Sequence, residues 1–374
     1  MKVALVHPQY KPDGGAEKAV SSTIEALLHK GARVKIITRS WTEQGGDVEV
    51  VRCDPFYLGR LWREWSFVRA AGKVLAEMDV DIVQSQVRLP GCDIYRAGGG
   101  VHREWLKQRN RISGFLRRLF TRLSLFHRYK LNAESKLYAD PRLRAVICNS
   151  RMVKKEIKQY FAVPEEKIHV VYNPVDLHGF DSRHLREQRD AVRNRLGVNG
   201  DQTIFLFVGS GFERKGLGAL LEAMAALPKD CFLIVVGKDR QAGKYQRRSR
   251  KLGIAERVWF AGVQKDVRPF YAAADAFVLP TLYDAFANTV LEAMAASLPV
   301  ITSCKCGAVD IIENGRNGFV CDALDLQKIS GYMESLRDPG LRRAMGDAGR
   351  DTVAGFTVEN MSSSLYALYE KILG

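Results

Sequence analysis

Short runs of apolar residues alternate with stretches of helical periodicity along the whole chain. In the first half the runs are VALV (3–6), VKIIT (34–38), DIVQSQ (81–86), AVICNS (145–150) and IHVVYNP (168–174). In the second half they are IFLFVG (204–209), FLIVVG (232–237), VWFAG (258–262), AFVLP (276–280), PVITS (299–303) and GFVC (318–321). Helices are expected at about 16–29, 152–161, 217–226 and 242–252. Near-continuous Val/Ile/Leu strands separated by helices indicate parallel sheets covered on both faces.

The alternation restarts near residues 173–174, ahead of a charged stretch. A chain of 374 residues is long enough for two domains, each with its own core. We therefore expect an α/β protein with two doubly wound, Rossmann-like domains, residues 1–175 and 176–356. The final helix, 357–374, is compatible with packing on either domain. Ligands of such sheets bind beyond the carboxyl ends of the strands, so the cleft between facing domains is the expected site.

The net charge of +15 requires an anionic partner, such as nucleic acid, anionic lipid or a phosphorylated ligand. The cysteines are mostly single and lie in apolar runs, which suits buried thiols in a reducing compartment. Cys304 and Cys306 form a C-x-C, but no second pair completes a zinc site. The N-terminal VALV is interpreted as a strand, not a signal peptide, and no window approaches the ~20 apolar residues of a membrane span. A cytoplasmic protein is expected.

Two glycine-containing loops follow strands and precede helices. Gly14 and Gly15 lie before the first helix, where they favour either a bound anion or a plain tight turn, and both interpretations stay open. The segment FVGSGFERKG ends a strand at Gly209 and carries Arg214 and Lys215 before the next helix. Adjacent cations there predict a diphosphate site, with a solvated Arg-Lys pair in a surface turn as the alternative. The spacing is not that of a P-loop.

The segment YDAFANTVLEAMA, 283–295, joins a loop to a helix. Asn288 fits the cap of that helix. Asp284 is compatible with bonding inside its own loop. Glu292, by contrast, lies between apolar neighbours in a strongly apolar helix, where an unpaired carboxylate is costly. Its carboxylate therefore requires hydroxyl or cation donors, and the two hydroxyls of a ribose would serve.

Several motifs occur in a fixed order: GSGFERKG, VVGK, FAGVQKDV, AAADAFVLPTLYDAFANTVLEAMAASLPVITS and GAVDIIENGRNGF. This order resembles the retaining nucleotide-sugar glycosyltransferases of family 4, which have the GT-B fold. The resemblance covers the whole chain and is densest from about 145 to 321. Within the family, the start YKPDGGAE, the RSW after the second strand and YRAGGGVHREW are similar to the lipopolysaccharide core-region glucosyltransferases. The resemblance implies transfer of a hexose, glucose from UDP-glucose, to a lipopolysaccharide core or similar lipid-linked saccharide.

The same resemblance implies a role for each motif residue. Arg214 and Lys215 would hold the donor diphosphate and stabilise the leaving nucleotide. Asp284 occupies the first carboxylate position of the E-x7-E signature, which contacts the donor sugar, and Glu292 would bond the ribose. Further donor-binding positions are Gly14, Gly15 and Gly209 near the phosphates, Val263 and Gln264 beside the base, and the backbone N–H groups of Phe286, Ala287 and Asn288.

Two positions depart from the family pattern. Asp284 stands where Glu is usual, and its shorter arm moves the carboxylate by about one C–C bond, so the donor-sugar preference could differ. Related core transferases commonly carry an Asp in the segment that matches AGGGVH, where this chain has Gly98, Gly99 and Gly100. The nearby His102 is then the candidate for a catalytic contact with sugar or acceptor, with a surface loop histidine as the alternative.

Leaving-group stabilisation dominates the implied chemistry, because charge develops on the diphosphate. Arg214, Lys215 and nearby helix N-termini would supply it, so we expect neither a metal nor another cofactor. Asp79-Val80-Asp81 spells D-x-D, the metal motif of the other transferase fold, but it directly precedes a strand and is interpreted as a loop-to-strand start. A phosphate oxygen of the donor is expected to take the proton of the attacking hydroxyl.

Residues 102–130 concentrate cations against a single acid, Glu104, with apolar side chains interleaved at roughly helical spacing. Such a segment is typical of an interfacial helix on anionic lipid, with a solvated basic helix on the domain core as the alternative. We expect a monomer, peripheral on the inner face of the cytoplasmic membrane. A nucleic-acid binder would suit the charge, but no helix-turn-helix, zinc-finger, RRM or OB pattern is present. A same-fold transferase with a soluble acceptor and a non-catalytic sugar-nucleotide binder stay open.

Overall fold

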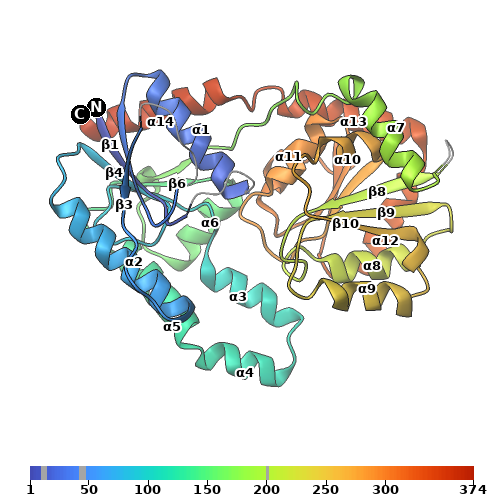
Figure 1. Ribbon diagram of the computed structural model, residues 1–374, viewed down its shortest axis with the longest axis horizontal. Helices are drawn as coiled ribbons and strands as arrows, with labels where there is room; N and C mark the ends of the chain where they lie inside the picture. The colour runs from blue at the N-terminus through green and yellow to red at the C-terminus, as the bar shows by residue number, and fades with distance from the viewer. Residues whose placement is uncertain (10–14, 42–47, 199–201) are drawn as a thin grey trace. The chain divides into compact units, whose positions relative to one another are not determined.

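The computed structural model contains two parallel sheets, each flanked by helices (Figure 1). The structure describes residues 1–9, 15–41, 48–198 and 202–374. Its contacts divide the chain into an N-terminal unit, Met1–Pro174 with Val358–Gly374, and a C-terminal unit, Val175–Thr357. The predicted α/β class with two doubly wound, Rossmann-like domains is confirmed. The last helix, whose domain the sequence left open, belongs to the N-terminal unit.

The sheet of the N-terminal unit has the strand order β3-β2-β1-β4-β5-β6-β7. Its strands are β1 (Lys2–Val6), β2 (Arg33–Thr38), β3 (Val48–Arg52), β4 (Ile82–Ser85), β5 (Ile94–Arg96), β6 (Ala145–Cys148) and β7 (Ile168–Val170). Neighbouring strands pair in parallel, with Val3 opposite Val34 on one side and Ile82 on the other. The strands β3 and β5 were not predicted, because β3 is an edge strand without a buried residue and β5 is only three residues long.

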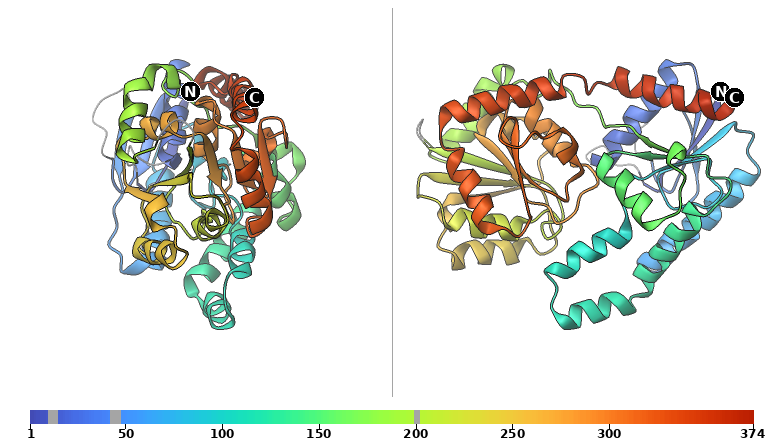
Figure 2. Two further views of the ribbon diagram at one scale, coloured as in Figure 1. Left: turned by 90° about the vertical axis from the view of Figure 1, so that its right-hand side faces the viewer. Right: turned by 180° about the vertical axis from the view of Figure 1, so that it is seen from behind.

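Helices cover both faces of this sheet. They are α1 (Gly15–His29), α2 (Gly59–Ala76), α3 (His102–Arg111), α4 (Phe115–Leu123), α5 (Leu125–Tyr138), α6 (Arg151–Tyr160), the 3-10 helix η1 (Glu165–Lys167) and α14 (Val358–Leu373). Leu27 of α1 and Leu365 of α14 share one core cluster with Val3, whereas Phe67 of α2 shares a second cluster with Val6. Side chains alternate between the faces of a strand, so the two clusters lie on opposite faces of β1. Helix α14 lies beside α1 (Figures 1 and 2).

The sheet of the C-terminal unit has the order β10-β9-β8-β11-β12-β13, again all parallel. Its strands are β8 (Thr203–Val208), β9 (Cys231–Val236), β10 (Val258–Gly262), β11 (Ala276–Leu279), β12 (Val300–Ser303) and β13 (Gly318–Cys321). Its helices are η2 (Ser182–Leu185), α7 (Arg186–Arg195), α8 (Leu217–Ala225), α9 (Ala242–Lys251), η3 (Ala255–Arg257), α10 (Arg268–Ala273), α11 (Asn288–Ala295), η4 (Gly307–Ile311), α12 (Leu326–Ser335) and α13 (Pro339–Val353). The strand order reverses beside β8, which places its carboxyl end at the switch point of the sheet, where ligands bind in such folds.

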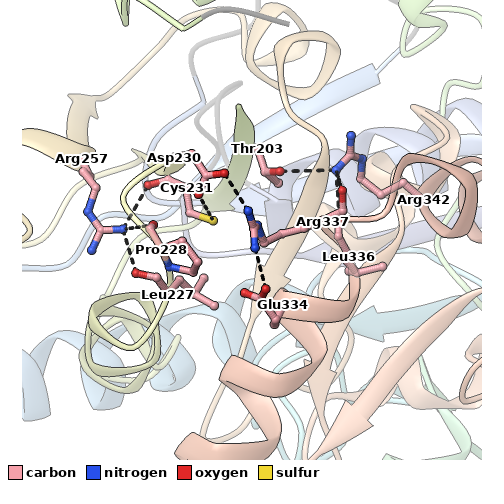
Figure 3. Close-up of polar contacts among 10 residues, drawn as sticks. All are labelled: Thr203, Leu227, Pro228, Asp230, Cys231, Arg257, Glu334, Leu336, Arg337 and Arg342. Atoms are coloured by element: carbon pink, nitrogen blue, oxygen red, sulfur yellow. Dashed lines mark hydrogen bonds and ion pairs between the residues drawn. The ribbon is translucent and has the colours of Figure 1, made fainter. Parts of the chain in front are cut away.

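At the opposite end of this sheet, where its strands begin, arginine side chains donate hydrogen bonds to carbonyl and carboxylate oxygens (Figure 3). Arg257 donates to the carbonyl oxygen of Pro228 at 2.6 Å, and Arg337 donates to both Asp230 and Glu334 at 2.7 and 2.6 Å. Part of the chain's positive charge therefore has a structural use, because it satisfies carbonyl and carboxylate oxygens where strands begin.

The D-x-D sequence also has a structural setting. The backbone N–H of Lys2 donates to Asp81 at 2.7 Å, and the ammonium of Lys2 pairs with Asp79. Both acids thus tie the start of β4 to the start of β1, as expected of a loop-to-strand start. Among the described residues, no cluster of three His, Cys, Asp or Glu side chains could hold a metal ion. No helix in the described part of the chain is long and apolar enough to cross a bilayer.

Candidate active site

Glycines allow neighbouring strand ends in the C-terminal unit to approach closely. Gly209 follows β8, and a Cβ atom there would lie 3.3 Å from Cγ of Lys215. Gly237 follows β9 with φ of +130°, and its Cβ would lie 2.2 Å from the carbonyl oxygen of Gly209. Gly216 has φ of +79°, and its Cβ would lie 1.8 Å from the carbonyl oxygen of Pro280. Larger residues are therefore excluded at Gly237 and Gly216, and the stem of Lys215 lies along the end of β8.

The central feature of the site is an ion cluster of Lys215, Arg214 and Asp284. The ammonium of Lys215 lies 2.6 Å from Oδ2 of Asp284, and Nη1 of Arg214 lies 2.9 Å from the same oxygen. Arg214 also donates to the carbonyl oxygen of Tyr283 at 3.2 Å. Lys215 and Asp284 are buried, whereas the side chain of Arg214 is 40% exposed. Two cations share one carboxylate, so the cluster carries a net positive charge at a strand end.

Asp284 is held in its ionised form by these neighbours. Burial alone would raise the pKa of its carboxyl, but Lys215 and Arg214 outweigh burial and lower the pKa to about 2. Its backbone is fixed as well: its N–H donates to the carbonyl oxygen of Lys305 at 2.9 Å, and its own carbonyl accepts from Gly307 at 2.8 Å. The carboxylate is therefore a preorganised counter-ion for both cations that were predicted to bind the diphosphate. Its partners come from a distant part of the chain, so its bonding is not confined to its own loop.

Glu292 lies on α11 with a partner that sequence reasoning missed. The hydroxyl of Tyr271, on α10, donates to Oε2 of Glu292 at 2.9 Å. Both side chains are buried, and burial together with the Glu292 charge raises the pKa of Tyr271 well above its usual value. The expectation that a buried helical carboxylate needs a hydroxyl donor is thus met inside the protein. No spacing rule in the sequence links Tyr271 to Glu292, so only the packing of α10 against the site could reveal it.

The loop before α11 is buried. Phe286 and Ala287 are both inaccessible, and α11 starts at Asn288. The prediction that Asn288 caps this helix is wrong, because Ala287 is the N-cap residue and accepts through its backbone carbonyl from Val290 at 2.9 Å. Asn288 therefore occupies the first helical position, where helix N–H groups face the N-terminal end.

The remaining predicted donor contacts have different settings. Val263 follows β10 and is 60% exposed. Gln264 turns back on its own loop, since its side-chain amide donates to the carbonyl oxygen of Ala261 at 2.6 Å. Gly15 is the first residue of α1, and Gly14 lies outside the described residues.

His102 begins α3 in the N-terminal unit and is buried, so the alternative of a surface loop histidine is wrong. Its backbone N–H lies 3.1 and 3.2 Å from the two oxygens of Glu134, which also accepts from Arg88. Its Nε2 lies 3.1 Å from Nδ1 of His127, and the two rings stack. Nη1 of Arg109 lies 3.4 Å from the other ring nitrogen of His127. His102 is therefore one member of a connected polar network, not a lone histidine.

The network holds both histidines in the neutral form. Burial, followed by the charges of Arg88 and Lys130, lowers the pKa of His102 to about 3. Burial and the charge of Arg109 lower the pKa of His127 to about 4. A neutral imidazole presents one N–H donor and one acceptor, so His102 can hydrogen-bond a hydroxyl but does not carry positive charge near neutral pH.

The basic segment 102–130 forms three helices and not one. Helix α3 packs partly on the domain, α5 contacts α2, α3 and α4, and α4 between them has no buried residue. Gly114 and Ser124, in extended conformation, separate α4 from its neighbours. The apolar residues Phe115, Leu116, Leu119, Phe120 and Leu123 of α4 are all exposed.

Comparison with known proteins agrees with this architecture. Residues 13–178 match the Glycosyltransferase Family 4 domain, and residues 188–352 match Glycosyl transferases group 1. The lipopolysaccharide glucosyltransferase WaaG of Escherichia coli K12 is 27% identical over 328 residues, which cover 86% of this chain and 85% of the relative. A crystal structure of WaaG superposes with a TM-score of 0.84 at 22% identity, covering 98% and 99% of the two chains. Anabaena HepE in complex with UDP-glucose superposes with a TM-score of 0.75 at 20% identity, covering 99% and 100%.

The fold and the order of the two matched domains define a protein of the GT-B class. The chain belongs to the glycosyltransferases of family 4, with a family 4 N-terminal domain and a group 1 C-terminal domain, and is related to the lipopolysaccharide core glucosyltransferases.

Proposed function

We propose that this protein transfers glucose from UDP-glucose to a lipopolysaccharide core or similar lipid-linked saccharide, with retention of configuration and without a metal. The observation that carries the proposal is the pair of cations, Arg214 and Lys215, held by Asp284 at the end of β8. Support for the donor comes from HepE, whose structure holds UDP-glucose, and support for the acceptor comes from the name of the WaaG relative.

The cation cluster suits a leaving diphosphate. In the free protein Asp284 neutralises part of the positive charge, which lowers the cost of keeping Lys215 buried. A diphosphate carries more negative charge than one carboxylate and would compete for the same donors. When the glycosidic bond breaks, further charge develops on the phosphate oxygen, and fixed cations stabilise that state more than the ground state.

The acceptor hydroxyl would attack on the face from which the nucleotide leaves. A phosphate oxygen of the leaving group takes its proton, so the protein needs no nucleophile of its own. Asp284 would orient the donor sugar, Glu292 and Tyr271 would hold the ribose, and the neutral His102 would position a hydroxyl of sugar or acceptor.

Helix α4 supports a membrane-bound acceptor. Phe115 and Phe120 are 78% and 71% exposed, an unusual setting for aromatic side chains of a monomer. Each such side chain contributes about 1.5–3 kcal/mol when it leaves water. Exposed Arg117, Arg118 and Arg122 on the same helix would each add about 1 kcal/mol near anionic lipid. A nine-residue helix of this kind would lie in the membrane interface.

The donor part of the proposal is tested by titrating UDP-glucose, UDP-galactose and GDP-mannose into the protein and following thermal unfolding. We expect UDP-glucose to raise the melting temperature most and to be hydrolysed slowly to UDP and glucose, also in the presence of EDTA. Stabilisation by no sugar nucleotide would overturn the proposal, and stabilisation without hydrolysis or transfer would favour a non-catalytic binder.

The acceptor part is tested by sedimentation with neutral and anionic vesicles. We expect binding to anionic vesicles, its reduction by high salt, and its loss in the variant Phe115→Ser/Phe120→Ser. Equal binding to both vesicle types would contradict the proposed anionic surface, and full transfer to a soluble saccharide would favour the soluble-acceptor alternative.

A further inference from the structure

A groove runs between α2 and α5 in the N-terminal unit. These helices are in contact, and they lie side by side in Figure 1 and in the right-hand view of Figure 2. Leu61, Trp62 and Trp65 line the groove from α2, and Leu125, Arg128 and Tyr129 line it from α5. In each helix the lining positions are three and four residues apart, so they form one continuous face. Most of this face is apolar or aromatic.

The groove leaves a large apolar surface in contact with water. Trp62 and Trp65 are 38% and 45% exposed, and Leu125 is 67% exposed. Phe56, just before α2, packs edge-on against Trp62 with ring centroids 5.5 Å apart and is itself largely exposed. Contiguous apolar surface of this kind usually marks a binding site. Tyr and Trp are the side chains enriched where apolar and aqueous phases meet.

The charges around the groove specify the kind of ligand. Arg128 lines it directly, and the guanidinium of Arg69 lies 5.7 Å from the centre of the Trp65 ring. The acid of α2, Glu64, is paired with Lys130 at 3.0 Å. Apolar walls with a cationic rim complement an amphiphile that has a hydrocarbon chain and an anionic head.

The groove also adjoins the proposed membrane surface. Leu125 follows α4 after Ser124, so the exposed apolar residues of α4 and the groove belong to successive helices in contact. We propose that the groove binds one acyl chain of an anionic phospholipid, with the phosphate near Arg128. This inference rests on the proposed membrane-linked function. It extends that function from the surface helix α4 to a defined lipid site between α2 and α5, and the sequence did not indicate a part for α2.

The experiment separates lipid binding in the groove from general adsorption to a membrane. Dihexanoyl-phosphatidylglycerol, kept below its micelle concentration, is titrated into the full chain by calorimetry. Glycerophosphoglycerol supplies the same head without chains, and dihexanoyl-phosphatidylcholine supplies the chains with a neutral head. We expect saturable binding of the anionic lipid, at least tenfold weaker binding of the neutral lipid, and no binding of the bare head group.

Variants locate the site. Trp62→Ala/Trp65→Ala should weaken binding of the short anionic lipid at least tenfold. Leu125→Glu, at an exposed position, should do the same without removing packed side chains, and circular dichroism checks the fold of both. The matched control Leu326→Ala, at an exposed apolar position of the C-terminal unit and outside the groove lining, should leave this binding unchanged.

Four outcomes would overturn the proposal: no binding of the anionic lipid, equal binding of the bare head group, unchanged binding in both groove variants, or a wild-type dimer that dissociates in those variants. The last would identify the groove as an interface between two copies. UDP-glucose binding is measured on the same samples. If lipid binds but UDP-glucose does not, the proposed donor is refuted and the proposed lipid site is retained. If UDP-glucose binds but lipid does not, only the proposed lipid site is refuted.

Discussion

Lys215 and Asp284 meet at 2.6 Å, although 69 residues separate them in the chain. The first follows β8 and the second follows β11, and these two strands are neighbours in the parallel sheet. Carboxyl ends of parallel strands meet at one edge, so the sheet brings a buried ammonium onto a buried carboxylate at the place where this fold binds ligands.

Replacing Lys215 with Ala should reduce turnover about 10²–10³-fold, because one fixed charge at the leaving group is lost. Arg214 still neutralises Asp284 in this variant, so the fold should persist. Steady-state rates with UDP-glucose and circular dichroism measure the two effects. Lys229→Ala, at an exposed lysine of the same domain, is the matched control and should behave as wild type. Equal rates in both variants would argue against the diphosphate role.

Asp284→Asn should change the acid sensitivity of the protein. The folded-state pKa of Asp284 is about 2, against an ordinary value of 3.8, so its stabilising contribution is fully present above pH 4 and is lost as pH falls through 2. At pH 7 the free energy of unfolding of the wild type should exceed that of the variant by on the order of 2 kcal/mol. Urea unfolding from pH 7 to pH 2 should show this gap closing in the acid range. A gap that stays constant with pH would exclude the charge as its cause.

Tyr271→Phe removes one hydroxyl and keeps the ring. A hydrogen bond to a charged acceptor is worth about 1.5–3 kcal/mol, so unfolding should become easier by that order. Because Glu292 loses the donor that orients it, affinity for UDP-glucose should also fall several-fold. The control is Tyr332→Phe in the same domain, where the ring of Tyr332 stacks on that of Phe319. This control should leave donor affinity unchanged. If Tyr271→Phe destabilised the protein but left donor affinity intact, Glu292 would have no part in donor binding.

The paired histidines predict destabilisation in mild acid. The pKa values of His102 and His127 are lowered to about 3 and 4 in the folded protein. The unfolded chain therefore binds protons first as pH falls below about 6.5, and stability should decrease from there towards pH 4. Unfolding by urea at a series of pH values should show this slope, and His127→Gln should reduce it. NMR titration of His102 near 6.5 in the native protein would contradict the prediction.

The sequence alone predicted the layered architecture, since apolar runs of strand length separated by helical periods admit few other folds. It also singled out Arg214, Lys215, Asp284 and Glu292 as candidates, because charged residues beside strand ends or within apolar helices are chemically conspicuous. Strand β3 and helix α2 were not predicted. An edge strand such as β3 buries few side chains, and the hydrophobic periodicity of α2 is weak. The predicted cap at Asn288 was wrong by one residue, because Ala287 caps the helix through its backbone and the sequence pattern does not fix a helix end to the residue.

The partners of these residues were decided by tertiary structure. Asp284 was expected to face a sugar, and in the structure it is the counter-ion of both cations. Glu292 was expected to need a hydroxyl or cation donor, and Tyr271 supplies a hydroxyl. His127 beside His102, and α2 beside α5, likewise come from distant segments. Local sequence reports which groups are costly to bury, because burial and charge are properties of single residues and their periodicity. Which group offsets that cost depends on the order of strands in the sheet and the helices packed on it, and so appears only when the chain is folded.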